Sequence, residues 1–258
     1  MPKQPPSDTE AISRLNDRVA ELEFSIAEQE RQTNLMIRSF IHDIKNPLAV
    51  TLGSLQVAKL VEGKNLSPKA IRLLDAAIEG GAHQLAMIHN LSEQIKIEMG
   101  ELTLIKEAFD PGLTLKKQIG IISQKESSRS FLLNESLLER MVLGDESIFE
   151  RGVGIVLDHC IKHTNRTGSI VSETKFDEKK QIWTLTISDD GELLASEQLD
   201  NIFDRHKLPV IKNLGARRDI GMGLSYARTA LRAMGGDLVA VENNGVGAKF
   251  VISLKCSE

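Results

Sequence analysis

Aromatic residues, cysteines and long apolar runs are scarce in this chain of 258 residues. Aromatic residues make up 4% of it and hydrophobic residues 41%, so aliphatic side chains must form most of the core, as they do where helices pack together. The two cysteines, Cys160 and Cys256, do not form a CxxC pair. The sequence therefore predicts neither a disulfide framework nor a cysteine zinc site, and it favours a reducing, cytoplasmic location.

The chain also lacks an excess of charge of either sign and any apolar run of the ~20 residues that a membrane helix needs. Its formal net charge is −4, which gives no electrostatic attraction to nucleic acid or to an acidic membrane. The initial MPKQPPSD has no apolar centre of the kind that signal peptides have. We therefore expect no membrane span and no nucleic-acid partner, and we expect any signal to be detected by a separate sensor protein.

Heptad spacing is the main feature of the N-terminal region. Residues 1–9 are polar and rich in proline, which predicts a disordered tail. Over residues 10–34, apolar side chains recur at alternating steps of three and four, which is typical of a coiled coil. These side chains are Ile12, Leu15, Val19, Leu22 and Ile26. No glycine or proline interrupts residues 10–46, so one long helix is expected.

A helical hairpin is predicted over residues 35–99. The first helix should end at VEGKN, because glycine and asparagine often terminate helices. In the following SPK, Ser67 suits an N-cap and Pro68 the first helical position, and the second helix should run to about Met99. A hairpin with one wide apolar face cannot bury that face alone, so we expect a homodimer that forms a four-helix bundle.

From residue 100 the pattern changes to mixed helices and strands. Helices are predicted at about 146–162 and 226–234, and strands in ELTLIKEAFD, RSFLLNES, SIVSETKF, QIWTLTISDD, DLVAVENN and AKFVISLK. We expect residues 100–258 to form one compact α+β domain.

The segment FIHDIKNPLAV, residues 40–50, carries polar groups on an otherwise apolar helical stripe. An unprotonated imidazole such as that of His42 can attack a phosphoryl group, and the neighbouring Asp43 can accept the proton or orient the ring. Asn46 lies about one turn further on, on the same face, where its amide can orient a water molecule or an acyl-phosphate oxygen. Pro47 removes one helix hydrogen bond and favours a bend. The segment therefore suits a phosphoryl-accepting histidine, and the alternative is an amphipathic helix with a core histidine and a proline kink.

This segment resembles the phosphoacceptor box of two-component sensor histidine kinases. Phe40, His42, Asp43, Lys45, Asn46, Pro47 and Leu48 match that box. The resemblance implies that His42 is phosphorylated, that Asp43 acts as the base, and that Asn46 supports dephosphorylation of a response regulator. The receiver domain of such a regulator is then the expected partner.

The second half resembles the catalytic and ATP-binding domain of the same family, an α/β sandwich of the GHKL type. ISDDG, IFDRH, IGMGL, MGGDL and NNGVGAKFVISL appear in the family order. The resemblance places Asp189 at the adenine amino group and Gly221 and Gly223 at the phosphates, and it adds Gly191 and Lys162 to the ATP-contacting residues. The expected cofactors are ATP and Mg²⁺.

Several positions depart from the family motifs in ways that act against ATP and Mg²⁺. In IVLDHCIKHT, Ile155 replaces one asparagine of the family box and His159 replaces the other, which in the family holds Mg²⁺ through its amide oxygen. Magnesium prefers oxygen ligands, so no side chain of this chain is assigned to a metal. In DDGEL, Leu193 stands where the family has glycine and would narrow the pocket, and Glu192 stands where the family has a small residue and could repel phosphates.

Three hypotheses arise for the function. The first is an autokinase that transfers phosphoryl from ATP to His42. The second is a phosphotransferase or phosphatase that exchanges phosphoryl between His42 and a receiver aspartate without binding ATP, in other words a pseudokinase. The third is a non-enzymatic scaffold that forms a heterodimer with an active histidine kinase. The presence of His42, Asp43 and Asn46 together argues against a pure scaffold.

Overall fold

The computed structural model describes residues 8–134, 140–204 and 222–256. The chain divides into two compact units, residues 1–88 and 89–258. The boundary lies inside a helix, so the last turns of that helix belong to the second unit. Among the described residues, no helix combines the length and the apolar character needed to cross a membrane.

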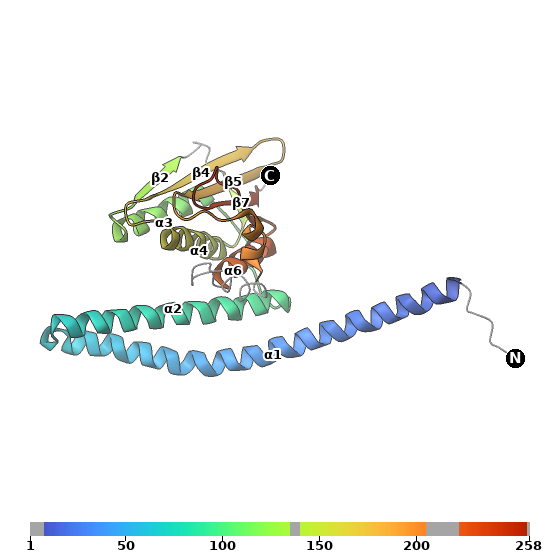
Figure 1. Cartoon of the computed structure of the whole chain (residues 1–258), viewed down its shortest axis with the longest axis horizontal. Helices are drawn as coiled ribbons and strands as arrows, with labels where there is room; N and C mark the ends of the chain where they lie inside the picture. Colours follow the sequence, from blue (N-terminus) through green and yellow to red (C-terminus); the bar gives the residue numbers. More distant parts are fainter. Residues whose placement is uncertain (1–7, 135–139, 205–221, 257–258) are drawn as a thin grey trace. The chain divides into compact units, whose positions relative to one another are not determined.

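The first unit consists of a long helix and most of a second one, joined by a short turn. Helix α1 spans Asp8–Glu62, a 3-10 turn covers Gly63–Asn65, and α2 spans Pro68–Glu98. The two helices run antiparallel from this turn (Figure 1). Ser67 caps α2 as predicted, because its Oγ accepts a hydrogen bond of 3.2 Å from the Ala70 N–H. Lys59 Nζ and Asp75 Oδ1, 2.6 Å apart, join the two helices near the turn.

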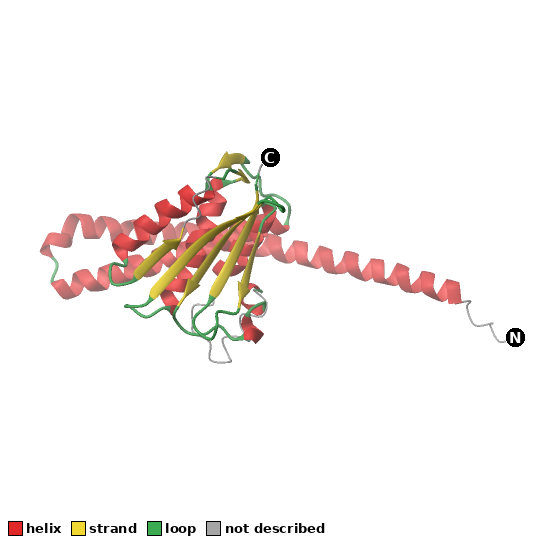
Figure 2. Cartoon of the chain, turned by 90° about the horizontal axis from the view of Figure 1, so that it is seen from above, coloured by secondary structure: helices red, strands yellow, loops and turns green. Residues whose placement is uncertain are grey.

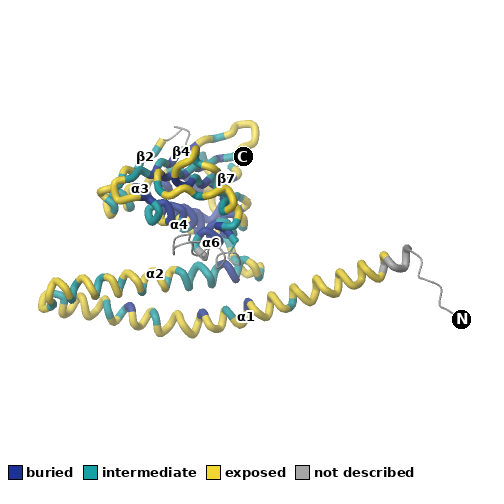
Figure 3. Tube along the Cα trace, in the orientation of Figure 1, coloured by how far each residue is buried: buried dark blue, intermediate teal, exposed yellow. Residues whose placement is uncertain are grey.

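The start of α1 corrects one boundary. The helix begins at Asp8, so the last two residues of the segment predicted as a disordered tail are helical. The heptad side chains beyond it are exposed in the single chain: Ile12 by 58%, Leu15 by 65%, Val19 by 51%, Leu22 by 48% and Ile26 by 55%. Figure 3 shows this long exposed stretch of α1. An apolar stripe of this length remains available for another helix.

The second unit is built on a five-stranded sheet with the order β2-β4-β5-β7-β6 (Figure 2). Its strands are β2 (Ser130–Asn134), β4 (Ser169–Asp177), β5 (Ile182–Asp189), β6 (Asp237–Val241) and β7 (Lys249–Lys255). The pair β2–β4 is parallel and the other three pairs are antiparallel. Both predicted hairpins, β4–β5 and β6–β7, are confirmed. Every second residue of β5 is buried, as expected of a strand with one face on the core.

Three helices cover one face of this sheet (Figure 1): α3 (Pro111–Lys125), α4 (Glu146–His163) and α6 (Met222–Ala233). Two short strands, β1 (Glu107–Phe109) and β3 (Val142–Gly144), pair with each other, and 3-10 turns cover Ser196–Gln198 and Asn201–Phe203. The core between the layers contains the fully buried side chains of Phe149, Leu185, Tyr226 and Phe250. A helical region followed by a mixed α/β sheet domain is therefore confirmed.

Helix α3 was not predicted from the sequence. Asp110 caps it, because Oδ1 accepts hydrogen bonds from the N–H groups of Gly112 at 2.8 Å and Leu113 at 3.2 Å. Pro111 occupies its first position. An aspartate followed by proline is a recognisable helix start. This local signal was overlooked because the preceding residues were interpreted as a strand.

Candidate functional site

The polar residues predicted on the first unit lie together on an exposed stretch of α1. The side chains of His42 and Asp43 are 75% and 73% exposed, and His42 Nδ1 lies 3.5 Å from Asp43 Oδ1. Asn46, one turn later, is exposed as well. Pro47 lies inside the helix and supplies no N–H for the carbonyl four residues earlier, while its own carbonyl accepts a hydrogen bond of 2.9 Å from Thr51 Oγ1. The imidazole is thus accessible to a large reactant and has a carboxylate beside one nitrogen.

A second group of predicted residues surrounds Asp189, the last residue of β5 in the second unit. Its side chain is buried, with 4% of the residue exposed. Asp189 Oδ1 accepts a hydrogen bond of 2.9 Å from the Gly191 N–H, and its own N–H donates to the Ala248 carbonyl at 3.0 Å. Asn243 Nδ2 donates to the Asp189 carbonyl, also at 3.0 Å. The backbone and one oxygen of this carboxyl group are therefore held firmly.

The other oxygen of the same carboxyl group lacks a strong hydrogen-bond donor among the described residues. Asp189 Oδ2 is buried and accepts no N–H or O–H hydrogen bond from the described residues. The pKa of Asp189 is raised, because the effect of burial outweighs the opposite effect of hydrogen bonds from the Gly191 N–H and the Cys160 thiol. Burial also raises the pKa of Cys160, so this thiol stays neutral and is at most a weak donor. A bound molecule with an N–H group would satisfy Oδ2 and remove the cost of leaving it unpaired.

Two glycines allow the chain to close around Asp189. A Cβ atom on Gly191 would lie far inside van der Waals contact of the His163 carbonyl oxygen, and one on Gly247 would collide with the Asp189 carbonyl. Gly247 also has a φ of +58°, a conformation that favours glycine. Its N–H donates to the Gly191 carbonyl at 3.1 Å, which ties the two glycine turns together. Both positions therefore require the absence of a side chain.

His159 is a packed, neutral core residue. It is 8% exposed, its ring centroid lies 4.3 Å from that of His163 and 5.3 Å from that of Phe250, and the contact with Phe250 is edge-on. Burial, with the nearby positive charges of His163 and Lys162, lowers the pKa of His159 to about 3. An imidazole held among rings in this way cannot take over the oxygen chemistry of the asparagine that the family motif has at this position.

The remaining residues predicted to affect ATP binding lie on α4, on α6 and after β5. Lys162 Nζ pairs with Asp158 Oδ2 at 2.8 Å on α4. Gly223 lies in the first turn of α6, where a Cβ atom would come within 3.1 Å of Ile155 Cγ2, so this glycine permits the close approach of α4 and α6. Leu193 is 52% exposed, and Gly221 lies outside the described residues. The described residues contain no group of three or more His, Cys, Asp or Glu side chains arranged to hold a metal ion.

Three residues of this site, Cys160, Asn243 and Gly247, had been given no role from the sequence. They come from α4 and from the β6–β7 loop and meet Asp189 only in the folded domain. For Asn243 and Gly247 a local signal exists in the glycine- and asparagine-rich turn NNGVG. For Cys160 the sequence offers none.

The depressed pKa of His159 predicts acid sensitivity of the second unit. In the unfolded chain this histidine takes up a proton near pH 6.5, whereas in the folded chain it does so only near pH 3. The contribution of neutral His159 to the unfolding free energy is therefore fully present above about pH 6.5 and is lost as the pH falls below that value. Between pH 7 and pH 5 the loss amounts to about 2 kcal/mol of unfolding free energy. We expect His159→Asn to abolish this part of the loss in urea titrations that follow Trp183, the single tryptophan, which is buried in β5. An equal loss in the variant would contradict this assignment.

Comparison with known proteins finds similar sequences for both halves of the chain. Residues 144–258 match the family of histidine kinase-, DNA gyrase B-, and HSP90-like ATPases. The chain is 28% identical over 236 residues to the sensor protein KdpD of Clostridium acetobutylicum. This alignment covers 88% of the present chain and 25% of that protein. It is 27% identical over 248 residues to KdpD of Escherichia coli, covering 95% of this chain and 27% of that one. The chain thus spans about a quarter of the length of these relatives.

Solved structures show the same fold. The full-length ShkA structure in complex with AMPPNP aligns with a TM-score of 0.67 and 19% identity, over 86% of this chain and 46% of that chain. The histidine kinase AdeS of Acinetobacter baumannii aligns with a TM-score of 0.57 and 18% identity, over 84% of this chain and 98% of that one. At these identities the likeness concerns the fold.

Proposed function

Because the chain belongs to the sensor histidine kinase family, we propose that His42 accepts a phosphoryl group and exchanges it with an aspartate of a response-regulator receiver domain. The observation that carries this proposal is the exposed imidazole of His42 next to Asp43 on α1. Receiver transfer requires a histidine that a second protein can reach, and a side chain exposed by 75% meets that requirement.

We infer a role for each neighbour of His42 from its position on α1. Asp43 lies on the Nδ1 side of the His42 ring, so Nε2 is the atom that attacks phosphorus, while the proton on Nδ1 passes toward the carboxylate. The N–P bond forms as the bond from phosphorus to the leaving oxygen breaks. Asn46, one turn away, can orient the water molecule that hydrolyses the acyl phosphate of the receiver.

ATP is the first candidate for the phosphoryl donor. Asp189 Oδ2, buried and without an N–H or O–H donor in the described part of the chain, suits the exocyclic amino group of adenine. Gly191 orients that carboxylate, and Gly221, Gly223 and Lys162 are proposed to face the phosphates. The match to the ATPase family and the AMPPNP complex of ShkA support a nucleotide site of this kind.

A phosphorylated receiver is the second candidate for the donor. The packing of His159 between two rings leaves no amide oxygen where the family motif holds Mg²⁺, and Ile155 lies against Gly223 instead of offering a polar group. Without that metal, the charge on the transferring phosphoryl group loses an interaction worth several kcal/mol. The chain would then act as a phosphotransferase or phosphatase.

The partner of the exposed heptad stripe is proposed to be a second copy of this chain. The exposed side chains recur with heptad spacing, which suits a coiled coil between identical helices. Pairing with a different histidine kinase is the alternative. Size-exclusion chromatography with light scattering distinguishes the homodimer from a monomer that needs another kinase.

One experiment tests the function and identifies the donor. The pure chain is incubated with labelled ATP and Mg²⁺, and separately with a receiver labelled on its aspartate, and label on His42 is measured under conditions that preserve phosphoramidates. Label from both donors identifies an autokinase, and label from the receiver alone identifies a phosphotransferase. Label from neither donor, with no effect of the chain on receiver dephosphorylation, would leave the scaffold as the remaining hypothesis.

A further inference from the structure

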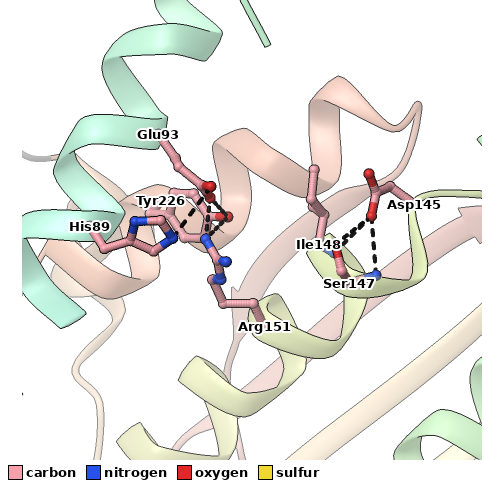
Figure 4. Close-up of polar contacts among 7 residues, drawn as sticks. All are labelled: His89, Glu93, Asp145, Ser147, Ile148, Arg151 and Tyr226. Carbon is pink, nitrogen blue, oxygen red and sulfur yellow. Dashed lines mark hydrogen bonds and ion pairs between the residues drawn. The ribbon is translucent and has the colours of Figure 1, made fainter. Parts of the chain in front are cut away.

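A polar cluster joins the last turns of α2 to α4 and α6 within the second unit (Figure 4). Glu93 Oε2 accepts hydrogen bonds from the Tyr226 hydroxyl at 2.7 Å and from Arg151 Nη1. Arg151 Nη1 also donates to the Tyr226 hydroxyl oxygen at 3.2 Å. His89 Nε2 lies 3.5 Å from Glu93 Oε1, the other oxygen of the same carboxylate. Three separate helices thus meet at one carboxylate.

The protonation of the cluster is fixed by its surroundings. Burial raises the pKa of Tyr226, and the hydrogen bond to Glu93 raises it further, so the phenol keeps its proton and donates. The guanidinium of Arg151 can only donate hydrogen bonds. Glu93 therefore acts as the common acceptor of a neutral and a charged donor, an arrangement in which removing one partner leaves the others poorly satisfied.

A second set of contacts seats the same segment of α2. Gln94 Nε2 donates a buried hydrogen bond of 3.0 Å to Ser225 Oγ, and Ile95 is fully buried. Ser225 and Tyr226 both belong to the first two turns of α6, which begins at Met222. The segment His89–Glu98 therefore contacts the end of α6 that also carries Gly223.

The central contact is polar and still reached by water. The side chains of Glu93 and Arg151 are 18% and 34% exposed, so the charges can regain hydration when they separate, which lowers the cost of release relative to a fully buried ion pair. The cluster is thus suited to hold the segment in one position and to open at a lower cost than a fully buried ion pair.

We propose that Glu93, Arg151 and Tyr226 form a releasable latch that couples the seating of His89–Glu98 to the position of the first turns of α6. When the latch is closed, the segment His89–Glu98 and the start of α6 move as one body. When it is open, both become free together. Because Gly223 lies at the start of α6, nucleotide binding would also bias the latch, a consequence that rests on the proposed function.

Hydrogen–deuterium exchange of the full chain tests the latch. Glu93→Gln removes the charge and keeps the shape, and Tyr226→Phe removes only the hydroxyl. In both variants we expect amide exchange to accelerate about 10-fold in His89–Glu98 and in the first turns of α6, the size expected from losing a hydrogen bond to a charged group. The matched control is Glu79→Gln, an exposed glutamate on the same helix, which should leave both segments unchanged.

The outcomes separate the latch from the nucleotide site. Faster exchange in only one of the two segments, or in neither, overturns the proposal, and the fluorescence of Trp183 reports whether each variant is folded. Calorimetry with AMPPNP and Mg²⁺ is performed on the same samples. If the wild-type chain binds no nucleotide while the variants still accelerate both segments, the ATP branch of the proposed function fails and the latch stands.

Discussion

Replacing His42 with glutamine is expected to abolish phosphoryl uptake from every donor. Glutamine has similar length and polarity, but its amide nitrogen is not nucleophilic, so no N–P bond forms. The side chain of His42 is 75% exposed, so the substitution leaves no cavity and should not alter the stability of the helix by more than about 0.5 kcal/mol. Acid-labile label on the chain, measured with labelled ATP and with a labelled receiver, checks the prediction.

Two neighbouring substitutions serve as graded controls for His42. Asp43→Asn keeps the nucleophile and removes the proton acceptor, so transfer should slow by roughly 10²- to 10⁴-fold without disappearing. Asn46→Ala should preserve transfer and slow dephosphorylation of the receiver. If His42→Gln retains label at the wild-type level, the phosphoryl group resides on another residue and the assignment of the whole α1 segment is wrong.

Replacing Gly191 with alanine is expected to disable the Asp189 site and destabilise the second unit. The added Cβ would collide with the His163 carbonyl oxygen, which is backbone and cannot rotate away. The turn must shift, which costs about 1–3 kcal/mol of unfolding free energy. It also displaces the N–H that orients Asp189 Oδ1, so nucleotide affinity should fall roughly 10- to 100-fold. Urea titration and calorimetry with AMPPNP measure the two effects.

The matched control for Gly191 is Gly120, which lies inside α3 with open space around its Cα. Gly120→Ala adds the same methyl group and should stabilise the unit by about 0.5–1 kcal/mol through helix propensity, with nucleotide binding unchanged. If Gly191→Ala behaves like Gly120→Ala, the turn after β5 is not tightly built around Asp189, and the assignment of that site fails.

Local patterns in the sequence were sufficient for the helical hairpin and for much of the sheet. The bounds of α1 and α2 were predicted to within a few residues, because long helices depend on local periodicity. The evidence was the heptad spacing, the absence of glycine and proline over residues 10–46, and the helix start at Ser67 and Pro68. The β4–β5 hairpin was predicted from alternation in the same way. Helix α3 was missed where a strand-like stretch runs directly into a capped helix.

The environment of the sites depends on contacts between distant residues. Asp189 could be singled out from its motif, but the closure by Gly247 and the lack of an N–H or O–H donor to Oδ2 among the described residues arise only when β5 meets the β6–β7 loop. His159 was assigned to no metal from the sequence, and its edge-on packing against Phe250 in the core could not be read from the motif. Glu93 meets partners 58 and 133 residues away, a separation that no local pattern indicates.

The most direct test of phosphoryl transfer through His42 is mass spectrometry of the intact chain after incubation with each phosphoryl donor. We predict an added mass of one phosphoryl group that is lost in acid and retained in base, and fragmentation that places it on the imidazole of His42. An unmodified chain with both donors, or a modification that fragmentation places on any other residue, would contradict this prediction.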